Sequence, residues 1–445
     1  MYEINKCGLI NYFVTLPPIL NSMKRIFLFF VAILAITTLW AQDFSQINFT
    51  NDIYVKGIHS VKLNKQGYPF GFPLITLQSN EKLSLTFDDL EGDGRYLKYT
   101  FIHCTHDWKP DGMNQIEYLE GFNEDEITEY SYSFNTITSY THYSLTFPTE
   151  MMNVTKSGNY ILYVYDDNQS SPVLTRRFVV AEPNRAGITG AAHKPSDVSV
   201  MFEKQEVDFV ANTGAWAIRN PAQYLHATIL QNGRWENAIM GLRYRAGKPG
   251  EYDFDYDDNS NVFNGGSEFR EFDTKSLKYN GTRIVLVGIE RGENYAYVLE
   301  DLARPYGPYV SGTTACGRCY YKTEDFSGEN REEYVNTIFT LKTEYPMTGG
   351  KAYVFGELTD WRIVPEAELH FNSALGIWET KLFLKQGYYN YQYVFVPKGK
   401  KTIDETYIEG NHWETGNEYT VLLYLQEEGT SYDRLIGFEV LNVVR

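Results

Sequence analysis

The sequence predicts an all-β protein built from tandem immunoglobulin-like β-sandwiches. Between residues 83 and 108, two runs alternate apolar and polar residues, 83–87 and 99–101, and an acidic, glycine-containing turn joins them. Such alternation is typical of strands with one buried face. The same unit recurs in varied form along most of the chain, and no stretch carries a helical stripe of three turns. The 36 Tyr and 27 Phe residues also suit aromatic faces that pack across sheets.

A chain of 445 residues is too long for one core, so we expect about three domains. Residues 42–182 should form a first sandwich, 197–346 a second and 347–445 a third. Residues 183–196 contain Pro, Gly and Ala without apolar periodicity and are predicted to be a linker. The expected strands are, in order, 58–63, 74–77, 83–87, 99–101, 128–134, 140–147, 158–166, 174–180; 205–210, 224–231, 239–244, 252–256, 284–290, 295–299, 309–316, 319–323, 334–342; 351–356, 368–371, 378–384, 389–396, 419–425 and 435–443.

The composition limits the classes of partner. Hydrophobic residues make up 43% and charged residues 22% of the chain, which is typical of globular proteins. The formal net charge of −17 would repel nucleic acid and anionic lipid headgroups. We therefore expect no nucleic-acid partner.

An export signal is predicted near the N-terminus. Met23, Lys24 and Arg25 precede the apolar run 26–40, and Ala41 follows at a plausible cleavage point. We expect a signal peptide cut after Ala41, with Met23 as the true start and residues 1–22 upstream of it. The run is shorter than the roughly twenty residues of a membrane span, so a retained anchor is the alternative interpretation. No second run is long enough to span a membrane, and an exported protein is expected.

The cysteines offer one close pair, Cys316 and Cys319, in a C-x-x-C arrangement. The pair could be a redox motif or half a zinc site, but it does not open a helix and no second pair follows. A local disulfide or two free thiols at a hairpin tip is the simpler interpretation. Cys104 is expected to be buried in its strand.

Three other stretches were weighed as sites. His103, Cys104 and His106 could contribute zinc ligands. The acidic run 253–259 resembles a calcium loop but lacks the glycine and glutamate of the EF-hand pattern. The carboxylates of residues 88–93 could form an acid–base pair, although a solvated turn is the simpler interpretation. No common nucleophile, phosphate-loop or dinucleotide motif is present, so we predict no catalytic residue, no resident metal, no cofactor and no enzyme activity.

Short stretches spread over nearly the whole chain together resemble the plug proteins of the Bacteroidetes type IX secretion system, a family also described as a domain of unknown function. They are IHSV (58–61), LTFDDL (85–90), HC with DW (103–108), EYLEGF (117–122), YTHY (140–143), SGNY (157–160), QEVDF (205–209), QNGRW (231–235), EFREFD (268–273), QGYYNY (386–391) and EG with ET (409–415). Cys316–Cys319 departs from the family, which usually has an Asn-Gly-Arg-type turn there.

The resemblance implies a non-enzymatic periplasmic protein that docks on the periplasmic mouth of the outer-membrane translocon barrel. There it would block the channel while no substrate is exported. The loop 110–122 and the predicted hairpin 309–323 are the candidate contacts.

Separately, residues 351–396 resemble the early-set sandwich of glycogen-binding modules, in which aromatic faces stack on sugar rings. Trp361 and Trp378 are the candidate platforms here. The alternative function is therefore a carbohydrate-binding envelope protein. An outer-membrane β-barrel is a third interpretation of the aromatic content, against which the predicted linkers count.

Overall fold

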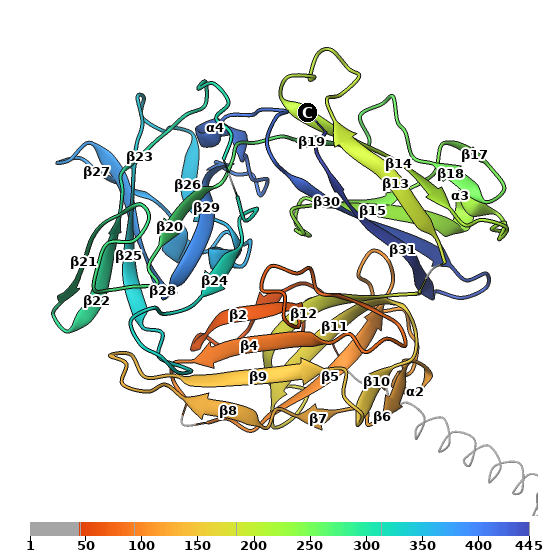
Figure 1. Cartoon of the computed structure of the whole chain (residues 1–445), viewed down its shortest axis with the longest axis horizontal. Coiled ribbons are helices and arrows are strands. Elements are labelled where there is room, and N and C mark those ends of the chain that lie inside the picture. Colours follow the sequence, from red (N-terminus) through yellow and green to blue (C-terminus); the bar gives the residue numbers. More distant parts are fainter. Residues whose placement is uncertain (1–43, 45, 93, 184, 313, 445) are drawn as a thin grey trace, which may run out of the picture. The chain divides into compact units, whose positions relative to one another are not determined.

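A computed structural model of the chain describes residues 44, 46–92, 94–183, 185–312 and 314–444 (Figure 1). The predicted signal peptide, its cleavage point at Ala41 and the predicted start at Met23 lie outside the described residues. The described strands all belong to one unit, Ile47–Arg445. Almost all regular structure is β, as the sequence predicts, and it forms three two-sheet sandwiches.

The first sandwich packs a six-stranded sheet, β1-β12-β11-β5-β7 with β3 beside β12, against the four-stranded sheet β2-β4-β9-β8. A short ribbon, β6 with β10, and the single-turn helix α2 lie beside them. The bounds are β1 Asp52–Ile53, β2 Ile58–Lys65, β3 Leu74–Thr76, β4 Leu83–Asp89, β5 Leu97–Cys104, α2 Gln115–Tyr118, β6 Leu119–Gly121, β7 Asp125–Glu126, β8 Glu129–Tyr132, β9 Thr141–Phe147, β10 Met152–Val154, β11 Gly158–Asp166 and β12 Pro172–Ala181.

Strand β4 has the predicted one-sided burial, because Leu83, Leu85 and Phe87 are buried while the residues between them are not. Strand β5 differs from the prediction, since it is buried on both faces from Tyr99 onward. Its outer face lies beside another sandwich: Cys104 stands opposite Asn159 on the neighbouring strand, and Asn159 Oδ1 accepts a hydrogen bond from the Tyr424 hydroxyl of the C-terminal part of the chain. Alternation at Tyr99 and Phe101 thus marks the core face, but it does not reveal the second covering layer.

The second sandwich is built from two distant parts of the chain. One sheet has the order β13-β14-β18-β17, with β19 also paired to β14, and the other has the order β16-β15-β30-β31. The bounds are β13 Gly187–His193, β14 Lys204–Asn212, α3 Pro221–Tyr224, β15 Leu225–Gln231, β16 Ile239–Leu242, β17 Ala246–Lys248, β18 Glu251–Asp253, β19 Val262–Asn264, β30 Glu418–Gln426 and β31 Asp433–Asn442.

The third sandwich is formed by the segment between β19 and β30. One sheet runs β21-β22-β25-β28-β27 with β23 beside β25, and the other runs β20-β29-β24 with β26 beside β29. The bounds are β20 Arg270–Asp273, β21 Ile284–Glu290, β22 Glu293–Val298, β23 Asp301–Leu302, β24 Cys319–Tyr321, β25 Tyr334–Lys342, β26 Gly350–Phe355, η2 Glu357–Thr359, η3 Pro365–Ala367, β27 His370–Asn372, β28 Ile377–Lys385, β29 Gly387–Pro397 and α4 Thr406–Glu409.

Two predicted boundaries differ from the strand pairing. The predicted linker 183–196 contains β13, whose backbone pairs with β14 from Gly187 to His193. The predicted division at 346/347 cuts through the third sandwich, because β25 before it pairs with β28 after it. Strand β30 then returns to pair with β15 along its whole length, so the third sandwich is an insertion in the second. Neighbouring strands of a sheet commonly follow one another in sequence, but many pairs in this chain do not, and this return spans the longest insertion within the second sandwich.

Candidate functional site at the sandwich junctions

The first and third sandwiches meet at a buried carboxylate, Asp88, which is 0% exposed at the end of β4. Its Oδ2 accepts hydrogen bonds from Lys385 Nζ and from the Tyr334 hydroxyl, each at 2.7 Å. Its Oδ1 lies 2.6 Å from His142 Nδ1. Burial alone would raise the pKa of Asp88, but the Lys385 ammonium and the His142 hydrogen bond lower it below its ordinary value. The expected solvated acidic turn is therefore wrong at Asp88, which is part of the strand and holds a buried charge.

A second set of charges joins the same two sandwiches. Lys62 Nζ lies 2.7 Å from Glu357 Oε2 and donates to the backbone carbonyl of Cys319 at 2.7 Å. Burial lowers the pKa of Lys62, and the charge of Glu357 more than offsets it, so the net shift is upward. Arg176, on β12, reaches Asp360 at 3.0 Å. These contacts fix one orientation, because a buried charge is tolerated only beside its partner.

The second and third sandwiches are joined through Arg234, which is fully enclosed just after β15. Its guanidinium forms a two-pronged pair with Glu405, at 2.8 and 2.7 Å, and a third contact with Glu236 at 2.7 Å. Burial raises the pKa of Glu405, but Arg234 reverses the shift and lowers it. Arg318 adds a pair with Glu418 at 2.6 Å. A two-pronged contact between a planar guanidinium and a carboxylate fixes the relative orientation of the two groups as well as attracting them.

The first and second sandwiches are joined by Glu182 and Arg434, whose side chains pair at 2.7 and 2.8 Å. Burial raises the pKa of Glu182, but the hydrogen bond and charge of Arg434 lower it overall. Nearby, the Tyr424 hydroxyl donates to Asn159 Oδ1 at 2.7 Å, and His106 Nδ1 lies 2.9 Å from Asp433. Each pair of sandwiches thus shares at least one buried or half-buried ion pair.

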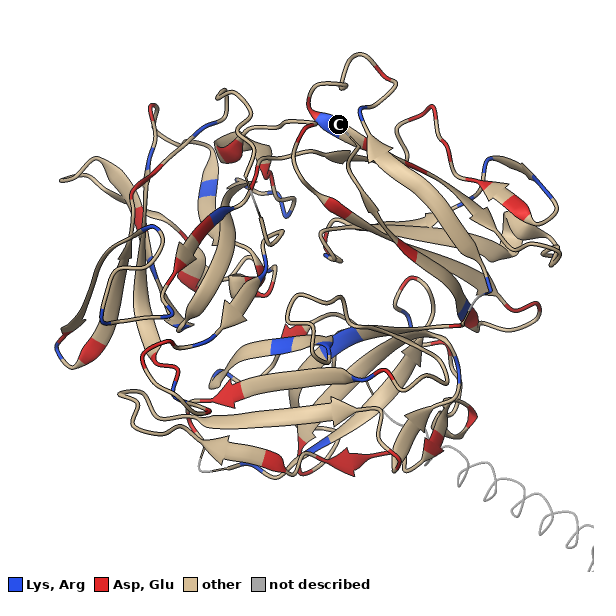
Figure 2. Ribbon diagram, viewed as in Figure 1, with Lys and Arg blue, Asp and Glu red and all other residues tan. Residues whose placement is uncertain are grey.

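Charges of both signs are spread over all three sandwiches (Figure 2). A pocket of about 770 Å³ opens between the first and third sandwiches, and Lys62, His142 and Lys385 are among its lining residues. Lys62 and Lys385, which carry the ion pairs of this junction, line the pocket but are themselves buried. No local sequence signal marks them, because each charge is supplied by a different sandwich.

The predicted cysteine pair lies next to two junctions: the Cys319 carbonyl accepts from Lys62 of the first sandwich, and Cys316 Sγ lies 3.9 Å from the Gly416 carbonyl, just before β30 of the second. Cys104, Cys316 and Cys319 are all free thiols and buried, so Cys316 and Cys319 form no disulfide here. Only Cys319–Tyr321 is a strand, and it pairs with β29; the predicted partner strand 309–316 is not formed. Burial raises the pKa of Cys316 to about 11 and raises that of Cys319 further. Low thiolate content makes both thiols poor nucleophiles and metal ligands.

Trp361, the first predicted sugar platform, packs among other side chains. The Arg234 guanidinium lies 4.9 Å from its ring centroid, and Phe355 and Phe269 meet it edge-on at 5.5 and 6.0 Å. A methyl group added to Gly317 would come within 2.2 Å of the same ring. Stacking on a sugar needs an open ring face. Trp361 instead packs where the second and third sandwiches meet.

Trp378, the second predicted platform, lies on β28 next to Phe371, with ring centroids 5.2 Å apart. Phe371 is exposed and Trp378 is half-buried against the core of the third sandwich. The two predicted platforms are therefore not brought together: one belongs to a junction and the other to a sheet surface.

The predicted zinc and calcium candidates do not converge on a common point. His103 bonds Asp111 and the Ser157 carbonyl, whereas His106 bonds Asp433. In the acidic run, Asp257 pairs with Arg245, and Asp258 accepts the Ser260 backbone N–H. Each group is used in a local contact. The sequence does not indicate that Asp88 pairs with Lys385, because the two residues are remote in sequence.

Two exposed apolar side chains lie on the predicted contact loop 110–122, and a third belongs to Met151, which bonds to that loop. Ile116, Phe122 and Met151 are 79%, 53% and 52% exposed. The Phe122 backbone N–H donates to the Met151 carbonyl at 2.8 Å, which holds the last two side by side. We call Ile116, Phe122 and Met151 the apolar tip. In the predicted 309–323 contact, Val310 is exposed, but residues 316–319 are enclosed in the junction.

Within the described residues, no helix is long and apolar enough to cross a membrane. This result leaves the predicted export signal untested, since that segment is outside them.

Comparison with known proteins assigns the first sandwich to a family. Residues 58–182 match the family model described as type 9 secretion system plug protein 1st domain. The crystal structure of a hypothetical protein from Parabacteroides merdae is similar over 89% of this chain and 100% of its own, with a TM-score of 0.84 and 29% identity. The C-terminal domain of the Streptococcus agalactiae AgI/II polypeptide BspA covers 86% of this chain and 99% of its own, with 7% identity and a TM-score of 0.15. A search of curated proteins gave no match.

Proposed function

We propose that this chain, whose residues 58–182 match the plug protein first domain of the type 9 secretion system, is a non-enzymatic gating component of that system. It would dock on the periplasmic mouth of the outer-membrane translocon barrel and close the channel between export events. The family match over the first sandwich is the observation that carries the proposal. The same family implies a place in the cell envelope, and the predicted signal peptide makes the periplasm the compartment we propose.

The junctions support a blocking role. A body that closes a pore must resist deformation, and freely jointed sandwiches would not. Buried and half-buried pairs such as Asp88 with Lys385, Arg234 with Glu405 and Glu182 with Arg434 restrict each junction to one geometry. Breaking one leaves an uncompensated buried charge, which is strongly unfavourable.

We assign the docking contact to the apolar tip. Exposed apolar residues that are held together are typical of protein contact sites. The tip lies in the matched first sandwich, and it includes two residues of the loop 110–122 that the sequence had indicated. The partner is the translocon barrel.

The test is purification of the chain from bacterial envelope extracts. Wild-type chain should recover the large outer-membrane barrel. The triple variant Ile116→Asp, Phe122→Asp and Met151→Asp should recover at least about tenfold less, because three charges replace the apolar contact.

The matched control places aspartate at Val285, Leu286 and Ile289, which are equally exposed apolar residues of the third sandwich. This control should keep normal recovery. Equal recovery by both triple variants would reject the apolar tip as the contact, and recovery of soluble proteins alone by the wild type would reject the function.

A further inference from the structure

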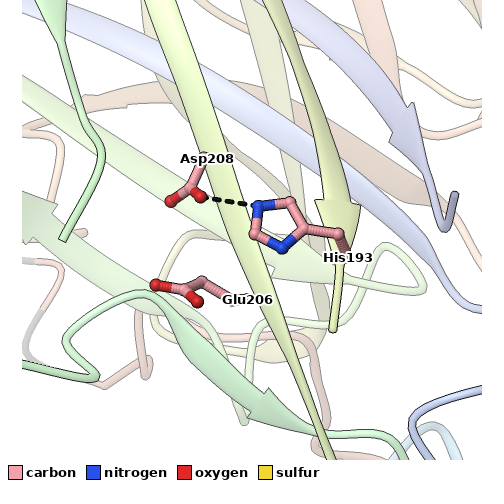
Figure 3. A group of neighbouring side chains, drawn as sticks. All are labelled: His193, Glu206 and Asp208. Carbon is pink, nitrogen blue, oxygen red and sulfur yellow. Dashed lines mark hydrogen bonds and ion pairs between the residues drawn. The ribbon is translucent and has the colours of Figure 1, made fainter. Parts of the chain in front are cut away.

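Three side chains of the second sandwich converge at one edge of a sheet (Figure 3). His193 ends β13 and stands directly opposite Glu206 on β14. Asp208 lies two residues further along β14 and so points from the same face. One ligand atom from each of the three residues can be chosen so that all lie within 4.8 Å of one another. No local sequence motif marks this group, because its members come together only across two strands.

The contact between His193 and Asp208 requires a cation. His193 Nδ1 lies 2.9 Å from the Lys194 backbone carbonyl, which can only accept, so this nitrogen carries a hydrogen. In the neutral ring, Nε2 therefore presents its lone pair to Asp208 Oδ2, 2.6 Å away. Two acceptors at that distance repel each other unless a proton or a metal ion binds them.

Glu206 gives an independent reason to expect a metal ion, and not only a proton, at this group of side chains. The residue is only 3% exposed, and its Oε2 accepts the Ser196 backbone N–H at 2.8 Å. Among the described lysines and arginines, none forms an ion pair with it. A buried carboxylate without a cation is unfavourable. With Asp208 beside it, the pair carries two negative charges, and one imidazolium would balance only one of them.

We propose that His193 Nε2, a Glu206 oxygen and Asp208 Oδ2 bind a zinc ion, with water at the fourth position. Zinc accepts imidazole nitrogen and carboxylate oxygen together, whereas calcium and magnesium prefer oxygen ligands alone. A divalent ion with a neutral imidazole and two carboxylates gives a net charge of zero. Binding displaces the His193 Nε2 proton to solvent.

Groups outside the cluster orient all three ligands. The Lys194 carbonyl fixes the His193 tautomer, the Ser196 N–H holds Glu206, and the buried Asn261 donates to Asp208 Oδ1 at 2.8 Å. Such outer contacts are characteristic of metal sites. The Nε2–Oδ2 separation must widen to about 3.3 Å to match tetrahedral bonds of 2.0–2.1 Å, a small side-chain movement. The ion would fasten the edge strand β13 to β14.

The site can be tested by calorimetric titration of the tag-free, chelator-treated chain with zinc chloride. Wild type should bind one equivalent. His193→Gln and Asp208→Asn should each weaken binding at least about tenfold. His370→Gln is the matched control, because His370 is exposed and stands opposite a single carboxylate, Glu379, on neighbouring strands. It should bind zinc as wild type does.

X-ray absorption at the zinc edge gives a second readout that does not depend on a variant's folding. The proposal expects nitrogen and oxygen neighbours near 2.0–2.1 Å and no sulfur. Sulfur near 2.3 Å would assign the ion to a cysteine instead. The proposal is overturned by that result, by no binding to wild type, or by binding that survives in both His193→Gln and Asp208→Asn. None of these outcomes bears on translocon docking.

Discussion

The core of the first sandwich and its junction with the third share one strand, β4, yet different forces hold them. Leu83, Leu85 and Phe87 are enclosed among apolar side chains of the core. The next residue, Asp88, is equally enclosed, but it is bound by Lys385, His142 and Tyr334. The stabilisation from apolar contacts increases with the area that is removed from water, and it depends little on the direction of each contact. Buried ion pairs add little net stability, but they favour the one arrangement in which each charge lies beside its partner.

This difference teaches how one chain can be both stable and rigid. The cores make each sandwich fold, while the junction charges decide how the sandwiches join. An ion pair of this kind favours one way of joining two sandwiches, because moving one sandwich against the other would leave a buried charge without its partner. The predictions below separate the two kinds of contact.

The largest effect is expected from Asp88→Ala. It leaves the Lys385 ammonium buried without its acceptor, which should lower the free energy of unfolding by about 3–5 kcal/mol. Phe101→Ala, a core truncation, should have a loss of similar size, about 3–5 kcal/mol, from the cavity it leaves. Urea unfolding followed by circular dichroism measures both.

A second substitution distinguishes the loss of a buried ion pair from the loss of core packing. Adding Lys385→Met to Asp88→Ala removes the stranded charge and should recover most of the lost stability, since apolar groups can replace a buried pair. If the double variant is no more stable than Asp88→Ala alone, the junction does not act through charge.

Acid should weaken the junctions before the cores. Asp88 is buried and Glu182 and Glu405 are half-buried, one at each junction; burial raises their pKa values, but their basic partners lower these values overall. A carboxyl whose pKa is lowered by folding stabilises the protein above its unfolded-chain pKa, about 4, and that contribution disappears as the pH falls through the lower folded value. Asp360 is an exception, because burial raises its pKa.

The urea midpoint should therefore fall steeply below about pH 4 in wild type. The same decrease should remain in Phe101→Ala, and it should be smaller in the Asp88→Ala, Lys385→Met double variant. Parallel pH profiles for all three proteins would contradict the role of the junction carboxylates.

The junction thiols should react slowly. Cys316 and Cys319 are buried with raised pKa values, so thiol reagents need both exposure and deprotonation. We expect labelling of the native chain to be roughly a hundredfold slower than in urea. Asp88→Ala should speed it, whereas rapid labelling of native wild type would show that the junction opens freely.

The smallest effect is expected at an exposed pair. Arg219 and Glu428 lie 3.2 Å apart on the surface. Arg219→Ala should change the free energy of unfolding by less than about 0.5 kcal/mol, because water and salt screen such pairs. A loss comparable to that of Asp88→Ala would remove the distinction between enclosed and exposed charges.

The sequence predicts contacts that are local and misses those that are not. The all-β class and most strands follow from alternation, which reports the buried face of each strand. Alternation does not name the partner strand, so the pairing of β15 with β30 across the inserted third sandwich was not foreseen. The composition of the glycine- and alanine-rich stretch 183–196 predicts a linker, whereas backbone pairing with β14 makes β13 a strand.

The roles of the candidate site residues likewise depend on contacts that are remote in sequence. An aromatic residue such as Trp361 suits a sugar platform or a packed junction equally well in sequence. Its role is decided by Arg234 and Phe269, which come from distant parts of the chain. The group of His193, Glu206 and Asp208 left one weak trace, two acids on one face of β14, and became visible only with the register of β13.

Closure of the channel is tested most directly by the permeability of the outer membrane in cells that lack this chain. The assay follows uptake of a hydrophilic compound too large for ordinary pores. We expect uptake to increase without the chain and to return to normal with the wild type, but not with the apolar-tip triple variant. Unchanged uptake in cells without the chain would contradict a gating role.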